Sequence, residues 1–269
     1  MSTVAPRPTY PYRGDPDYPT SDGEPMAETG IHVDLMLELL GTLMMRLVDD
    51  PMAYAGANMF LYYAEGDKRR VVSPDVFVTL GVPKEPQRVN YIVWQEGKPP
   101  DVIIELTSKS TRANDEGPKR LLYQDVLKIP EYFLFDPTED YLKPSLQGYR
   151  LVNGAYQPIG LVDGRMRCEI LGLDLVREGK MLRLYDAATG LKLLNSKETY
   201  RWAREVHLQA TRERNRADQQ ERRAEQERAR AEAEARKAEQ ERARADESAA
   251  EVRRLMKEIE ELKRQAGGS

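Results

Sequence analysis

The chain has 269 residues, of which 40% are hydrophobic and 32% are charged, with a formal net charge of −4 at pH 7. This length and composition allow one domain of ordinary size with a real hydrophobic core, plus an extension. The single cysteine, Cys168, excludes an intrachain disulfide and is typical of a reducing compartment.

The first 25 residues contain six prolines and several small polar residues but no apolar periodicity, so we expect a disordered leader there. From Met26 to Asp50 the pattern changes and predicts an amphipathic helix. Its apolar face repeats every four residues, at Ile31, Leu35, Leu39, Leu43 and Leu47.

Residues 35–48 form the most apolar segment of the chain, but Glu38 and Arg46 interrupt it. No cationic start followed by a continuous apolar stretch is present either. We therefore expect a cytoplasmic protein that does not span a membrane.

The pattern after this helix is mainly that of strands. Two β-rich runs, 58–67 and 68–80, flank the turn residues Glu65-Gly66-Asp67 and predict a hairpin, and residues 81–100 are expected to form a loop. A buried strand at 101–107, a helix over 115–128 and a strand at 131–137 follow. Further strands, expected to complete the same sheet, are predicted within 145–152, 155–162, 166–176 and 181–186.

Beyond Asn195 the composition shifts to Glu, Arg, Ala, Gln and Lys, which predicts a long helical extension over 196–269. A block of fourteen residues from Ala224 recurs directly after itself, which is two heptads. The end of the helix carries an apolar seam at Val252, Leu255, Ile259 and Leu262, so we expect a homodimer through this coiled coil.

The extension from Ser196 has 19 Lys and Arg against 17 Asp and Glu. Subtracting these from the totals of 41 and 45 leaves 22 against 28 for residues 1–195, a net charge of −6. A broad electrostatic grip on a polyanion is therefore not expected, and any contact with nucleic acid must rely on local groups.

Two strand carboxylates and one helix amine are the strongest candidates for chemistry. Asp75 borders the apolar run 76–78, and Glu105 lies inside a buried strand, where a charge is rarely left unpaired. Lys119 and Tyr123 share one face of the next helix. Once folded together, such groups can hold a hard divalent cation and a phosphate.

Each candidate also has a purely structural interpretation. Asp75 can open its strand at a solvated end, Glu105 can form a structural salt bridge, and Lys119 can pair with Asp115 on the helix surface. Asp101 shares the strand face of Glu105 but is better explained as a strand-entry residue than as a ligand.

The sequence contains few residues suited to other kinds of catalytic or binding site. Two histidines and one cysteine cannot build a multi-histidine or zinc-thiolate site within one chain. No Gly-rich loop of the Walker or dinucleotide type is present. The hydroxyls of residues 108, 110 and 111 lack an obvious base, so strand-end hydrogen bonding explains them better than nucleophilic attack.

The motifs Ser73-Pro74-Asp75, 101–111, 115–123 and 131–136 agree in order and spacing with a known family. Over residues 28–190 the chain resembles the Uma2-type (DUF820) endonucleases of the PD-(D/E)XK nuclease superfamily. The resemblance implies an α/β fold with a restriction-endonuclease-like mixed sheet flanked by helices, here followed by the long C-terminal helix. It also makes residues 26–195 the nuclease-like domain.

The same resemblance implies roles for individual residues. Asp75 and Glu105 would be ligands of Mg²⁺ or Mn²⁺, and Lys119 the amine near the scissile phosphate. The superfamily's usual lysine position is occupied here by Thr107; the group is thought to have moved the amine to the helix, and Lys109 is a substitute for Lys119. Accessory positions implied more weakly are Asp101, Tyr123, His32 and Glu28.

The function implied is metal-dependent hydrolysis of phosphodiester bonds in nucleic acid, with DNA the expected substrate. The alternative is an interaction protein, with a nuclease-like body of weak or lost catalysis that assembles through its C-terminal helix. The acidic body and the missing strand lysine favour the alternative, whereas the intact residues Asp75, Glu105 and Lys119 oppose it.

Overall fold

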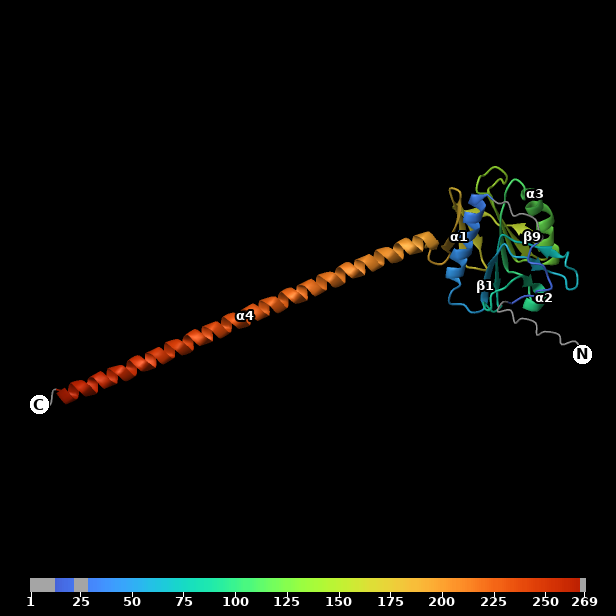
Figure 1. Ribbon diagram of the computed structural model, residues 1–269. Helices are drawn as coiled ribbons and strands as arrows, with labels where there is room; N and C mark the ends of the chain where they lie inside the picture. Colours follow the sequence, from blue (N-terminus) through green and yellow to red (C-terminus); the bar gives the residue numbers. More distant parts are fainter. Residues whose placement is uncertain (1–12, 22–28, 267–269) are drawn as a thin grey trace, which may run out of the picture. The chain divides into compact units, whose positions relative to one another are not determined.

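The computed structural model describes residues 13–21 and 29–266 (Figure 1). Contacts within the chain divide it into two compact units, Met1–Tyr200 and Arg201–Ser269, and each is described by itself. Over the described ranges, no helix combines the length and the apolar character needed to cross a membrane.

The first unit is built on a six-stranded mixed sheet with the strand order β1-β4-β6-β7-β8-β9. Strands β6 and β7 run parallel, and the other neighbours are antiparallel. The bounds are Ala53–Ala57 (β1), Val76–Leu80 (β4), Val102–Leu106 (β6), Glu131–Phe135 (β7), Leu146–Val152 (β8) and Ala155–Pro158 (β9).

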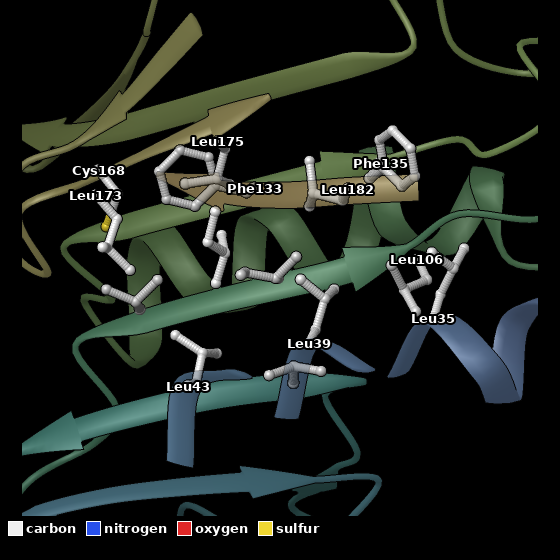
Figure 2. Close-up of a cluster of buried hydrophobic side chains, with 14 of the residues drawn as sticks. Leu35, Leu39, Leu43, Leu106, Phe133, Phe135, Cys168, Leu173, Leu175 and Leu182 are labelled. Carbon is white, nitrogen blue, oxygen red and sulfur yellow. The ribbon is translucent and has the colours of Figure 1, made fainter. Parts of the chain in front are cut away.

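Helices cover both faces of this sheet, which confirms the predicted α/β class. Helix α1 (Gly30–Arg46) contributes Leu35, Leu39 and Leu43 to a buried cluster with alternate side chains of β4, β6 and β7, as Figure 2 shows for several of them. The intervening side chains, including Phe77 and Ile103, face the other cluster. Because side chains alternate along a strand, each of these strands is buried on both faces.

The second face is covered by a helical stretch that begins at Arg112 and so starts earlier than predicted. It continues from α3 (Arg112–Asn114) through two π-helical turns, η1 (Asp115–Lys119) and η2 (Leu122–Val126). Pro118 lies within η1, and proline removes a backbone donor from a helix. Tyr123 and Leu127 of this stretch contribute to the second buried cluster.

The strands at the end of the body form a sheet of their own, so the prediction that all of them complete the main sheet is wrong. Strands β8 and β9 do extend the main sheet, whereas β10–β13 form a separate antiparallel sheet. Its strands are Leu161–Val162 (β10), Arg165–Cys168 (β11), Leu173–Glu178 (β12) and Met181–Asp186 (β13). Strands β11–β13 pack Cys168, Leu175 and Leu184 into the α1 cluster.

A three-stranded sheet with the order β3-β2-β5 contains the predicted hairpin and a strand that the sequence did not predict. The hairpin pairs β2 (Leu61–Tyr62) with β3 (Val71–Val72). The predicted loop 81–100 instead contains β5 (Tyr91–Ile92) and helix α2 (Val93–Glu96). Strand β5 has only two residues and depends on parallel pairing with β2, which leaves little local signal.

Residues 13–21 pack on the body, contrary to the prediction of disorder for the whole leader. Tyr18 is 9% exposed and lies edge-on to Tyr62, with ring centroids 4.8 Å apart. Asn90 Nδ2 donates hydrogen bonds to the carbonyls of Asp15 and Tyr18. Residues 1–12 and 22–28 lie outside the described part of the chain.

The C-terminal extension forms one helix, α4 (Ser196–Ala266), as its composition predicts. Glu and Arg recur at spacings of three and four, and each such pair stabilises an isolated helix by about 0.2–0.5 kcal/mol. The seam residues Val252, Leu255 and Ile259 are 49%, 51% and 52% exposed.

Candidate active site

Asp75 and Glu105 lie opposite each other on neighbouring strands. The antiparallel register pairs Val76 with Ile104 and Phe77 with Ile103, so one further step brings Asp75 opposite Glu105. The backbone N–H of Asp75 donates to Glu105 Oε2 at 3.2 Å. The two acidic residues are therefore neighbours across the sheet, although they are 30 positions apart in the chain.

Glu105 is fully buried and held by donors from the helical stretch 112–126. Tyr123 donates its hydroxyl to Glu105 Oε1 at 2.7 Å, and Lys119 Nζ lies 3.0 Å from the same oxygen. Lys119 Nζ is also 3.4 Å from Asp115 Oδ1 and donates to the carbonyl of Ser73. The structure thus brings Glu105, Lys119 and Tyr123 together.

Asp75 lies closer to solvent than Glu105. Its side chain is 15% exposed, and its Oδ2 accepts a hydrogen bond from the backbone N–H of Leu106 at 2.6 Å. His32 Nε2 lies 3.3 Å from Asp75 Oδ1. His32 is placed there by the first turn of α1, where Thr29 Oγ1 accepts from the backbone N–H of His32.

A pocket of about 690 Å³ opens in front of Asp75. The first turn of α1, the segment that follows β6 and the segment that follows β7 form its walls. The lining residues are Thr29, Ile31, His32, Asp75, Thr107, Ser108, Lys109, Ser110, Thr111, Pro137, Thr138 and Tyr141. Glu105 and Lys119 do not line this pocket; Glu105 is fully buried, and the side chain of Lys119 is 15% exposed.

The remaining predicted residues lie in different places. Lys109 is exposed and lines the pocket. Asp101 precedes the opposite end of β6, where it accepts from Lys98 Nζ and from the backbone N–H of Leu80. Asp101 is therefore not part of this cluster. Glu28 lies outside the described residues.

Two contributions to the site were missing from the predicted set. Asp115 is 1% exposed and adds a third carboxylate around Lys119; its position four residues before Lys119 was the available signal. The loop after β7 supplies Pro137, Thr138 and Tyr141. The carboxyl ends of parallel strands are a preferred place for ligands in α/β sheets, which is the rule that could have indicated this loop.

Burial and charge shift the titration of the two facing acids in opposite directions. Burial raises the pKa of Glu105 to about 8; the charge of Lys119 and the hydrogen bond from Tyr123 oppose this effect, and the charges of Asp75 and Asp115 add to it. Burial also acts to raise the pKa of Asp75, but the hydrogen bond from His32, the charge of Lys119 and the Leu106 N–H together hold it below its usual value. An acid whose pKa is raised toward the physiological range, beside an acid that stays ionised, is typical of functional sites.

The donor set fits a hard divalent cation. The carboxyl groups of Glu105 and Asp115 contact Lys119, and that of Asp75 is near enough to raise the pKa of the same lysine, so three acids are present beside a single lysine. Mg²⁺ is usually held by one or two carboxylates, with water and substrate oxygens completing its shell. Across residues 13–21 and 29–266, no group of three or more His, Cys, Asp or Glu is placed to hold a metal ion, so only that sparse kind of coordination fits.

The model of the Uma2 family, described as "putative restriction endonuclease", matches residues 9–176, which is more than half of the chain. No curated protein matches. One similar solved structure is that of a "putative nuclease belonging to DUF820" from Anabaena variabilis, with 19% sequence identity and a TM-score of 0.41 over 55% of this chain and 76% of the other.

The family match covers the part of the chain that contains the motifs described above. The match includes β4, β6, the helical stretch and β7, the elements that carry Asp75, Glu105 and Lys119. The chain belongs to the Uma2 family.

Proposed function

We propose that this protein is a divalent-metal-dependent endonuclease that hydrolyses phosphodiester bonds, with DNA as its substrate. The observation that carries the proposal is the juxtaposition of Asp75 and Glu105 across paired strands, beside a pocket and next to Lys119. Family membership supports the nuclease class.

Asp75 and Glu105 would hold Mg²⁺ or Mn²⁺ beside the pocket that Asp75 lines. When bound, the metal supplies a Lewis acid that lowers the pKa of water and offsets charge on the phosphate. Leu106 N–H and His32 orient Asp75, and Tyr123 orients Glu105. Lys119 contributes a fixed positive charge near the reacting phosphate and stabilises the ionised form of Glu105.

The test is cleavage of plasmid and single-stranded DNA in Mn²⁺ or Mg²⁺ by the wild type, Asp75→Ala and Glu105→Ala. We expect metal-dependent cleavage by the wild type and a loss of at least about 100-fold in both variants. Asp163→Asn is the matched control, because Asp163 lies in an exposed turn and its positive φ suits asparagine. Equal residual activity in all four proteins would mean that a contaminant cleaves the DNA.

A second candidate, a nuclease-like interaction protein without catalysis, is favoured by one observation. Lys119 is ion-paired with Glu105 and Asp115 and does not line the pocket, which is also how a purely structural lysine would lie. Calorimetric titration with Mn²⁺ separates the two candidates. An active site binds the ion in a way that Glu105→Ala abolishes, whereas a scaffold has no such site.

We also propose that α4 joins two copies of the chain through its exposed seam at Val252, Leu255 and Ile259. Removing residues 201–269 should lower the mass measured by sedimentation without changing the melting temperature of the body. If the particle contains one chain both with and without the helix, this role of α4 is rejected.

A further inference from the structure

We infer that the pocket in front of Asp75 accepts one unpaired nucleotide, so that the substrate is single-stranded or locally unpaired nucleic acid. This inference rests on the proposed nuclease function and names the form of its substrate. Four features support this inference: the position of the acids, the chemistry of the pocket walls, the anchoring of one wall and the charge of residues 1–195.

The acids are recessed. The side chain of Asp75, which lines the 690 Å³ pocket, is only 15% exposed, and Glu105 is fully buried behind the lining residues. This volume is within the range of about 300–1,000 Å³ that small-molecule sites have, and one nucleotide fits in it. In a duplex the bases are stacked inside a stiff rod, so a nucleotide can enter a pocket only when it is unpaired or flipped out.

Part of the pocket lining is polar and part is apolar or aromatic, and a nucleotide likewise has an anionic phosphate and a flat base. After β6, one wall presents the hydroxyls of residues 108, 110 and 111 together with the ammonium group of Lys109. The segments from α1 and after β7 contribute Ile31, Pro137 and Tyr141, beside the polar residues Thr29, His32 and Thr138. Hydroxyls and an amine suit a phosphate, and an aromatic ring beside apolar side chains suits the face of a base. The outer surface of a duplex would offer this pocket only phosphates, because the bases are stacked inside.

The wall that carries Tyr141 is anchored by a buried carboxylate. Asp136 ends β7 with no exposed surface, and it accepts hydrogen bonds from the N–H groups of Thr138, Tyr141 and Leu142. The Thr138 hydroxyl donates to the same carboxylate. These hydrogen bonds therefore fix the backbone of the loop at Tyr141 before any ligand arrives, which lowers the entropy cost of stacking a base on the ring of Tyr141.

The charge of the body argues against a duplex. Residues 1–195 carry 22 Lys and Arg against 28 Asp and Glu, whereas proteins that bind duplex nonspecifically neutralise many phosphates with basic groups. Binding must then come from local contacts. Stacking of a base on an aromatic side chain is such a contact, and it does not depend on base sequence.

The experiment measures binding and cleavage by the full-length protein. The probe is an oligodeoxynucleotide with one central 2-aminopurine, whose emission falls when it stacks on an aromatic ring, used as a single strand, in a perfect duplex and as an unpaired bulge in a duplex. A ribonucleotide copy of the single strand distinguishes RNA from DNA. Binding is measured with Ca²⁺ and cleavage with Mn²⁺.

We expect saturable quenching with the single strand and the bulge, and at least about tenfold weaker binding of the perfect duplex. Tyr141→Ala should abolish the quenching and weaken single-strand binding by about tenfold, as expected for the loss of one stacked base. Tyr141→Phe should retain both. Tyr200→Ala is the matched control, because Tyr200 is 69% exposed, and it should change nothing.

Duplex binding as tight as single-strand binding, or quenching that survives Tyr141→Ala, would overturn the inference. Failure of the nuclease function looks different. Quenching that depends on Tyr141, without cleavage of any substrate, would reject the hydrolase and leave the nucleotide site intact. Full-rate cleavage of perfect duplex without quenching would reject the nucleotide site alone.

Discussion

Lys119 Nζ lies 3.0 Å from Glu105 Oε1, and this contact joins the helical stretch after β6 to the strand itself. Glu105 is fully buried and Lys119 is 15% exposed, so water screens the pair only weakly. Burial acts to lower the pKa of Lys119, but the charges of Glu105, Asp115 and Asp75 raise it above its usual value, so the lysine stays charged. The candidate site therefore contains its own counter-ion.

Replacing Lys119 by methionine should destabilise the fold. At a pH above the Glu105 pKa of about 8, where this acid is ionised, the variant leaves Glu105 and Asp115 without their cation, and removing one partner of a buried ion pair costs about 3–5 kcal/mol. Urea unfolding of both proteins measures the difference in the free energy of unfolding. Lys180→Met, at an exposed turn, is the control and should stay within about 0.5 kcal/mol of the wild type. A Lys119→Met protein as stable as this control would show that the ion pair does not stabilise the fold.

Metal binding should become tighter as the pH rises from 6 to 8. Burial raises the pKa of Glu105 to about 8, so below that value this acid holds a proton that a metal ion must displace. The apparent affinity for Mn²⁺ should then increase by up to about tenfold per pH unit and level off above pH 8. Calorimetry in buffers of different ionisation enthalpy should detect proton release at pH 7. Heats that do not depend on the buffer would contradict this coupling.

Replacing Asp136 by asparagine should weaken the loop that carries Tyr141. Burial acts to raise the pKa of Asp136, but backbone hydrogen bonds from Tyr141 and Leu142 and those from Thr138 outweigh it and lower the pKa. The charged form is thus favoured in the folded state, and hydrogen bonds to a charged group each contribute about 1.5–3 kcal/mol.

The pH dependence of this loss has a defined sign. Because the folded pKa of Asp136 is below the unfolded value of about 3.9, the stabilisation is complete above that value and disappears as the pH falls through the folded pKa. The stability difference between wild type and Asp136→Asn should therefore be full at pH 6 and shrink under acid conditions. Urea unfolding at several pH values measures it, and a constant difference would contradict the assignment.

Strand β1 requires glycine at position 56. A Cβ added there would lie 2.5 Å from the ring of Phe77 and 3.0 Å from that of Tyr54. Gly56→Ala should overpack the core and cost about 1–3 kcal/mol. Gly160→Ala is the matched control, because a Cβ at that position meets no atom within 4 Å. Equal melting temperatures for the two variants would show that the core adjusts freely around Phe77.

The elements that the sequence predicted well are those with a strong local signal. Helix α1 has a repeat of four residues, β6 and β7 are mostly apolar and each contains one glutamate, and α4 is rich in Glu, Arg and Ala. Strands β1 and β5 were missed because β1 consists mostly of small residues and β5 has only two residues that depend on a distant partner. Tertiary pairing, not propensity, fixes such strands.

The candidate site shows the same difference between what local sequence indicates and what only tertiary pairing determines. The sequence identified Asp75, Glu105 and Lys119 as residue types suited to metal and phosphate, but their meeting depends on the register of β4 against β6. A shift of one residue would move Asp75 to the other face of the sheet. Tyr141 was not identified, since a polar loop has no periodicity and only the fold brings it to the pocket.

The most direct test of the account is a crystal structure of the protein soaked with Mn²⁺. We predict anomalous density between the carboxylates of Asp75 and Glu105, beside the pocket that Asp75 lines, and its absence in Glu105→Gln crystals soaked in the same way. An ion bound elsewhere, or density that persists unchanged in Glu105→Gln, would contradict the claim that these two acids share a metal ion.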